Sequence, residues 1–131
     1  MLVVDASVMA VALVDDGRDG EAARARLRGE DLAAPEILDL EVLSVLRRYV
    51  DRGTVRARAA NAAVVDLMRA PIARSSHRAL GARCWELRAN LTPYDAAYVA
   101  LAELLDAPLV TGDARLAGAP GVRCEVDVLS V

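Results

Sequence analysis

Residues 1–14 read MLVVDASVMAVALV, in which a single carboxylate separates two apolar segments. Residues 2–4 predict a short buried strand, and residues 7–14 predict a helix that ends at the polar residues 15–17. Asp5 stands at the junction, where burying an ionised carboxylate is costly unless it is paired or binds a metal. The groups that surround Asp5 are therefore the key to this fold and its function.

The composition indicates one folded domain that spans residues 1–131. Hydrophobic residues make up 55% of the chain and charged residues 27%, which is typical of a globular protein. The formal net charge is −3, so no global positive field is available to attract a polyanion. All 16 basic residues are arginine, which excludes any active site that requires a lysine.

Short apolar strands alternate with helices along the rest of the chain, a pattern typical of an α/β fold. The helices are predicted at residues 21–28, 36–52, 56–68, 77–88 and 92–105, and the further strands at residues 32–34, 71–73, 109–111 and 124–129. We therefore expect an α/β fold with a central, mainly parallel sheet of four to five short strands flanked by helices.

Several residues are predicted to have structural roles only. Cys84 and Cys124 have no metal-ligand spacing, so we expect buried thiols, and Trp85 is expected in the core. His77 opens a helix and is expected at the surface. The start of the chain has no basic leader and no apolar run long enough for a membrane span, so we expect a cytoplasmic location.

Two carboxylates follow predicted strands directly. Asp5 follows residues 2–4, and Asp113 follows residues 109–111. In open α/β sheets, ligands bind outside the carboxyl ends of the strands, so neighbouring strands would bring these two side chains into one crevice. Each residue alone is explained as well by a helix N-cap, because aspartate is favoured there.

Two further carboxylates lie in helices among apolar residues. Glu41 lies within LDLEVLSVL at residues 38–46, and Asp95 is the third residue of a helix that begins after Thr92. Asp95 alone fits a capping-box position, and Glu41 alone fits a solvated helix stripe. As a set, the four carboxylates would repel one another unless a cation neutralised them, and oxygen ligands suit Mg²⁺ or Mn²⁺ rather than zinc.

The motifs MLVVDASV, LTPYDAAYVALAELL and LVTGDARL, together with Glu41, occur in an order that resembles the PIN-domain ribonucleases, in particular the VapC-type toxins of toxin-antitoxin pairs. The resemblance extends from residue 2 to at least residue 116. It implies a Mg²⁺-dependent endoribonuclease whose catalytic and metal-binding residues are Asp5, Glu41, Asp95 and Asp113.

The resemblance also assigns finer roles. Asp5 and Asp113 would be the principal metal ligands, Asp95 would bind directly or through water, and Glu41 would orient the hydrated ion or accept a proton from the attacking water. Ser7 and Thr111 would support the first and last acids.

Substrate contacts are less specified by the sequence. Arg115, Arg18 and Arg47 are candidates to contact flanking phosphates. Tyr94 is a candidate to stack on a base. Tyr49 and Tyr98 lie on apolar helix faces and are expected to pack in the core.

The same resemblance implies three partners: an RNA substrate, a VapB-like antitoxin that covers the acidic pocket, and a second copy of the chain in a homodimer. An alternative is a PIN scaffold that has lost catalysis and binds RNA or protein. Other phosphate-handling α/β enzymes with acids at strand ends are excluded, because they rely on a lysine that this chain lacks.

Overall fold

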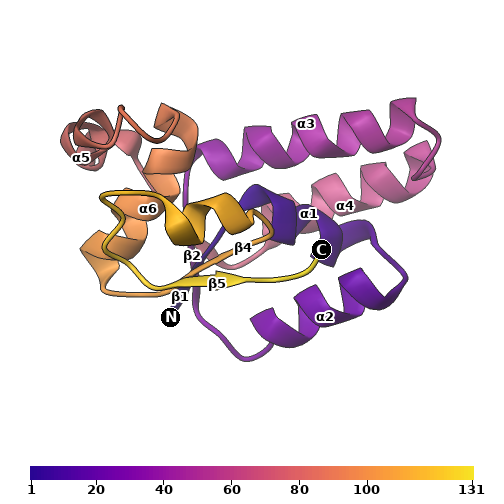
Figure 1. Cartoon of the computed structure of the whole chain (residues 1–131). Helices are drawn as coiled ribbons and strands as arrows, with labels where there is room; N and C mark the ends of the chain where they lie inside the picture. The colour runs from indigo at the N-terminus through magenta and orange to yellow at the C-terminus, as the bar shows by residue number, and fades with distance from the viewer.

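The computed structural model describes all residues from 1 to 131 and contains one sheet, six α-helices and two 3₁₀ helices. Figure 1 shows their arrangement, with the long helices α3 and α4 side by side. In chain order the elements are β1 (Leu2–Val4), α1 (Ala6–Val14), α2 (Arg18–Leu27), β2 (Leu32–Pro35), α3 (Ile37–Asp51), α4 (Ala57–Arg69), β3 (Ile72–Ser75), η1 (His77–Ala79), α5 (Gly81–Glu86), α6 (Pro93–Leu105), β4 (Leu109–Thr111), η2 (Ala114–Gly118) and β5 (Val126–Val128).

The five strands form one sheet in the order β3-β2-β1-β4-β5, and every neighbouring pair is parallel. The prediction of an α/β fold with a parallel sheet is confirmed. The chain adds strands in one direction from β1 to β3 and then returns to the other side of β1 with β4 and β5. The strand order therefore reverses between β1 and β4, which is where open α/β sheets bind ligands.

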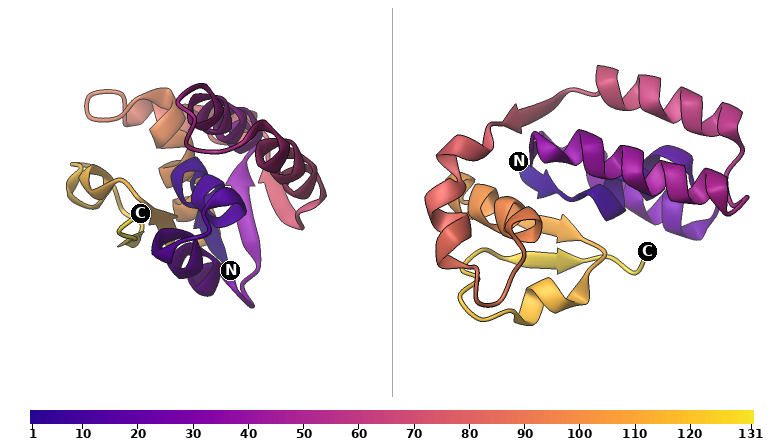
Figure 2. Two further views of the ribbon diagram at one scale, coloured as in Figure 1. Left: turned by 90° about the vertical axis from the view of Figure 1, so that its right-hand side faces the viewer. Right: turned by 90° about the horizontal axis from the view of Figure 1, so that it is seen from above.

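Helices cover both faces of this sheet. Connections between parallel strands are right-handed in almost all proteins, so α1 to α4 lie over one face, and α5 and α6, which lead to β4, lie over the other. Helix α6 packs against β1, β2 and β4, whereas α1 packs against α2, α3 and α4. The right-hand view in Figure 2 shows β4 and β5 side by side next to α6.

The apolar strands are buried because both faces are covered. Val3, Val4, Leu109 and Val110 have no exposed surface, and they belong to a core of 29 residues that includes most of α6. Thr111 is the one polar residue buried in the structure. Its position at the end of β4 marks the point where the apolar core meets the carboxylates.

An ion pair fixes the start of α3 relative to β3. The guanidinium of Arg74 on β3 donates to both carboxylate oxygens of Asp39, in the first turn of α3, at 2.8–3.0 Å. Arg74 also donates to the carbonyl of Leu67 at 2.8 Å, at the end of α4. These contacts hold the first turns of α3 in place, and Glu41 lies in that part of the helix.

One predicted helix is wrong. Residues 77–88 form the 3₁₀ turn η1 followed by the short helix α5, instead of a single helix. Gly81 lies at the junction, and glycine has a low helix propensity because it loses the most backbone freedom. Smaller differences occur at boundaries: α2 begins three residues earlier than the expected residue 21, and β3 and β5 are shifted or shortened by one to two residues at their ends.

The expectation that Trp85 lies in the core is also wrong. Trp85 is 68% exposed, and the buried residues of its segment are Leu80 and Leu87. Cys84 and Cys124 are half-buried free thiols, and burial raises the pKa of each. None of the helices has both the length and the apolar character needed to cross a bilayer.

Candidate active site

Asp5 and Asp113 lie at the carboxyl ends of β1 and β4, the two strands at the reversal of strand order. The strands pair directly, with Val4 opposite Val110. Each carboxylate also caps the helix that follows it: Asp5 accepts from backbone amides at the start of α1, and Asp113 accepts from the amide of Arg115 in η2. Both the capping role and the shared crevice that the sequence predicted are therefore present.

Asp5 is held by hydrogen bonds to both of its carboxylate oxygens. Oδ1 accepts from the Ser7 amide at 2.9 Å, the Val8 amide at 3.3 Å and the Ser7 hydroxyl. Oδ2 accepts from the hydroxyl of Thr111. Because these donors come from α1 and from β4, the Asp5 side chain is fixed in one orientation at the seam between them.

The same hydroxyl groups extend the network to the loop after β4. The Thr111 hydroxyl accepts from the Asp113 amide at 3.0 Å, and the Ser7 hydroxyl accepts from the Gly112 amide at 3.1 Å. Ser7 and Thr111 thus connect the two strand ends.

Glu41 reaches the same region from α3 and is hydrogen-bonded by a residue of α6. The hydroxyl of Tyr98 donates to Oε1 of Glu41 at 2.6 Å. Tyr98 is packed in the core, as predicted, but its hydroxyl contacts a candidate catalytic group, which the sequence did not reveal. Burial is the main cause that raises the pKa of Glu41, the charges of Asp95 and Asp5 raise it further, and the Tyr98 bond lowers it.

Asp95 lies in the first turn of α6, next to the helix cap. Its backbone amide donates to the Thr92 hydroxyl at 3.2 Å, so Thr92 caps the helix as predicted. Burial raises the pKa of Asp95, and the charge of Asp113 adds to this increase. The charge of Asp5 acts in the same direction, and both residues line the same pocket as Asp95.

Asp113 differs from the other carboxylates because it is paired with a cation. The Arg115 guanidinium donates to both Asp113 oxygens at 2.6–3.2 Å, and this contact lowers the pKa of Asp113. The Arg115 side chain is 85% exposed, so the pair lies at the rim of the site. Arg115 thus contacts a carboxylate of its own chain.

The four predicted carboxylates line a single pocket of about 450 Å³. The pocket is also lined by Ser44 and Arg48, on the turns of α3 that follow Glu41. Arg18 and Arg47, two of the predicted phosphate contacts, do not line it, and Arg48 is the only arginine that does. The signal for Arg48 is its spacing of seven residues from Glu41, which places both on one face of α3.

Metal binding can be judged from the donor set and its arrangement. No three carboxylate, cysteine or histidine side chains are arranged to hold one ion together. The pocket nevertheless offers several carboxylate oxygens and no thiolate or imidazole, which is the donor chemistry of a hard cation. Mg²⁺ usually keeps several waters and binds through only one or two carboxylates, so the residues present fit such an ion.

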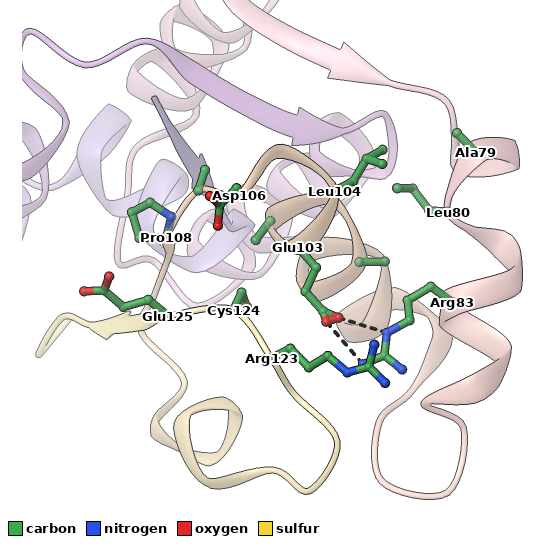
Figure 3. Close-up of a pocket in the computed structure, with 13 residues that line it drawn as sticks. Ala79, Leu80, Arg83, Glu103, Leu104, Asp106, Pro108, Arg123, Cys124 and Glu125 are labelled. Carbon is green, nitrogen blue, oxygen red and sulfur yellow. Dashed lines mark hydrogen bonds and ion pairs between the residues drawn. The ribbon is translucent and has the colours of Figure 1, made fainter.

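A larger pocket of about 560 Å³ lies elsewhere, between α5, α6 and the segment before β5 (Figure 3). Its deepest charged group is Glu103, which accepts two hydrogen bonds from Arg83 at 2.9 and 3.2 Å. Arg83 also donates to the Gly121 carbonyl at 2.6 Å. These contacts pair Glu103 with Arg83 and join three segments, so the pair has a structural role.

Replacing Tyr98 by phenylalanine is expected to reduce activity without unfolding the protein. The change removes the only hydrogen bond to the carboxylate of Glu41, so the pKa of Glu41 rises and the carboxylate loses its fixed orientation. Loss of a group that orients a catalytic carboxylate typically costs about 10- to 100-fold. The kcat of Y98F should fall by this amount, and the acid limb of its pH profile should move to higher pH.

The matched control for Tyr98 is Tyr49→Phe, which removes a half-buried hydroxyl on α3 outside the pocket. A pH profile of Y98F identical to that of the wild type would contradict the role of this bond.

Acidification is expected to stabilise the metal-free protein at first. Glu41 and Asp95 have raised pKa values in the folded chain, so between neutral pH and the ordinary carboxylate range near about 4 the folded state binds more protons than the unfolded state. Protonation of these two side chains stabilises the fold fully at pH values below their pKa in the unfolded chain. This stabilisation is lost as the pH rises through their pKa in the folded chain.

Thermal unfolding of wild type and Glu41→Gln across this pH range isolates the contribution of one group. E41Q should be more stable than the wild type at neutral pH, and its stability should increase less on acidification. The prediction fails if E41Q is less stable at neutral pH, or if both proteins respond alike.

This chain is similar along nearly its whole length to proteins of one family. Residues 2–122 match the family described as PIN domain. The chain is 40% identical over 129 residues to the VapC ribonuclease Mb0985 of Mycobacterium bovis, with 98% of each chain covered. It is 42% identical over 128 residues to ribonuclease VapC1 of Mycobacterium tuberculosis, with 97% of this chain and 96% of the relative covered.

The fold is shared with a solved toxin-antitoxin structure. VapBC2 from Rickettsia felis, bound to a DNA fragment from their promoter, aligns with a TM-score of 0.63 at 15% identity, over 96% of this chain and 98% of that chain. At this level of identity the likeness concerns the fold alone.

Proposed function

This chain belongs to the PIN-domain family and is of the VapC type, and from this premise we propose that it is an endoribonuclease toxin that hydrolyses RNA phosphodiester bonds with a divalent metal ion, Mg²⁺ or in its place Mn²⁺. The observation that carries the proposal is the pocket at the β1–β4 reversal, because four separate segments of the chain contribute carboxylates to it. The proposal takes residues 1–131 as one PIN domain.

In the proposed site Asp5 and Asp113 are the principal ligands of the metal ion, and Asp95 binds it directly or through a water molecule. When bound, the ion would lower the pKa of a water molecule and offset the negative charge on the phosphate. Asp5 suits its role because four hydrogen bonds already fix its orientation. Asp113 becomes available when the Arg115 guanidinium moves away, and Arg115 is then free to contact the phosphate next to the cleaved bond.

Glu41 is proposed to accept a proton from the attacking water or to orient the water around the ion. A general base works best when its pKa lies near the operating pH, and burial raises the pKa of Glu41 in that direction. The Tyr98 hydroxyl holds Oε1, so Oε2 is free of that bond and available for the water.

The proposed partners are RNA, a VapB-like antitoxin and a second copy of this chain. An antitoxin segment with a basic side chain would complement the acidic pocket, and the name of the Rickettsia felis structure pairs a VapB with a VapC protein. Apolar surface for a homodimer is available on α3 and α4, where Leu40, Val65 and Met68 are 47–62% exposed.

The test is an RNA cleavage assay with the purified chain, in Mg²⁺ and in Mg²⁺ with excess EDTA, followed by sequencing of the new RNA ends. Discrete ends that form in Mg²⁺, disappear with EDTA and return when Mg²⁺ is restored are the expected result. Cleavage that survives EDTA contradicts a metal-dependent nuclease. RNA binding without cleavage of any cellular RNA would instead support the inactive scaffold.

A further inference from the structure

A third pocket, which we call the aromatic pocket, lies beside the acidic one and has the opposite character. It has a volume of about 510 Å³ and is lined by ten residues from the start of α3, from η1 and α5, and from the start of α6. Its basic residues are His77 and Arg88, and no aspartate or glutamate lines it. A polyanion therefore meets no like charge in this pocket.

Two exposed aromatic rings dominate the aromatic pocket. Trp85 is 68% exposed and Tyr94 is 58% exposed, although both residue types are usually largely buried. The Arg88 guanidinium lies 4.6 Å from the centre of the Trp85 ring and donates to the Trp85 carbonyl at 2.9 Å. Exposed aromatic rings next to an arginine are the combination with which proteins stack the bases of single-stranded nucleic acids.

The two pockets are lined by adjacent residues of α6 and by residues one helical turn apart on α3. On α6, Tyr94 and Ala97 line the aromatic pocket, and Asp95 and Tyr98 line the acidic pocket. On α3, Ile37 lines the aromatic pocket, and Glu41, one turn later, lines the acidic pocket. A turn advances about 5.4 Å along a helix, so an RNA strand with a phosphate at the carboxylates has a nearby base within reach of Trp85 and Tyr94.

From these observations we propose that the aromatic pocket is a subsite that stacks an unpaired base of the RNA, within a nucleotide or two of the cleaved phosphate. The inference rests on the proposed nuclease function and assigns to that site one contact with a base of the RNA. A base inside a duplex is stacked on its neighbours, so a stem would have to open before its base could enter.

The test uses Trp85 itself as the reporter, because it is the only tryptophan of the chain. The full-length protein in Mg²⁺ is titrated with a single-stranded decaadenylate and, separately, with an abasic decamer that has the same sugar-phosphate chain. Tryptophan fluorescence measures binding, and gel electrophoresis of the same samples measures cleavage. We expect decaadenylate to quench the fluorescence and the abasic chain to leave it nearly unchanged.

The variant for this test is Tyr94→Ala, and the control is Leu104→Ala, which removes an equally exposed apolar side chain near the other end of α6. Stacking of one base is worth a factor of about 5 to 150 in affinity, so Y94A should weaken decaadenylate binding by that range, and L104A should not. Both changes lie at exposed positions and should leave the fold intact.

The outcomes separate this inference from the nuclease proposal. Quenching that depends on bases and on Tyr94 supports the subsite even if no cleavage occurs, whereas cleavage without such quenching supports the nuclease and overturns the subsite. A second result also overturns the subsite: Y94A sediments as a monomer where the wild type sediments as a dimer, and its affinity for RNA is unchanged. The aromatic rings would then belong to an interface between copies.

Discussion

Replacing Asp5 by asparagine is expected to lower the rate of RNA cleavage by about 10²- to 10³-fold or more, with little effect on folding. The amide oxygen of asparagine can still accept from the Ser7 and Val8 amides, and its nitrogen can donate to the Thr111 hydroxyl. What the variant loses is the negative charge at the centre of the site. The loss of rate therefore reports on charge and not on shape.

The matched control is Asp66→Asn, the same chemical change at an exposed position of α4 that is remote from the pocket. D66N should cleave RNA like the wild type, and all three proteins should have similar thermal unfolding midpoints. If D5N retains wild-type activity, the acidic pocket is not the catalytic site.

Replacing Gly20 by alanine is expected to cause the largest loss of stability from a single methyl group. A Cβ atom at this buried position of α2 would lie 1.9 Å from the carbonyl oxygen of Asp15 and 2.7 Å from its carbonyl carbon. These are backbone atoms, so the turn between α1 and α2 has to move.

That turn cannot move without breaking hydrogen bonds. The Asp15 carboxylate accepts from the Gly17 amide at 2.7 Å and the Gly20 amide at 3.1 Å, and the Asp15 carbonyl accepts from Arg24 at 2.8 Å. Alanine favours a helix by about 1 kcal/mol over glycine, whereas overpacking costs about 1–3 kcal/mol. G20A should therefore lower the free energy of unfolding by up to about 2 kcal/mol.

Chemical denaturation of Gly20→Ala and Gly81→Ala measures this effect with an internal control. A Cβ at Gly81 meets no atom within 4 Å, so only the helix propensity acts and G81A should gain about 0.5–1 kcal/mol. Equal effects of the two substitutions, of either sign, would show that the close approach of α1 and α2 does not constrain the fold.

The fold and two of the four carboxylates were accessible from the sequence because their signals are local. An apolar strand followed at once by an aspartate occurs at Asp5, and the end of residues 109–111 repeats the pattern with Asp113. The rule that parallel sheets bind ligands at the carboxyl ends of their strands then brings these two residues together. Glu41 and Asp95 follow no strand; they were noticed as acids among apolar helix residues, and the family resemblance placed them in the site.

The contacts of these carboxylates depend on distant parts of the chain and were not predicted. Tyr98 and Glu41 are 57 positions apart, and only the tertiary fold brings the hydroxyl on α6 to the carboxylate on α3. A signal existed, since a buried tyrosine hydroxyl usually requires a partner and Tyr98 is one turn from Asp95. The exposure of Trp85 was also not predicted, and this residue lies on the short helix α5 that replaces the single helix expected at residues 77–88.

Crystals of the chain grown or soaked with Mn²⁺ test whether the carboxylates of the acidic pocket bind a divalent metal ion. We expect anomalous density for manganese in the acidic pocket, in direct contact with Asp5 and at least one of Asp95 and Asp113. Crystals of Asp5→Asn should show no such density. An empty pocket in crystals whose protein cleaves RNA in Mn²⁺ would contradict this metal site.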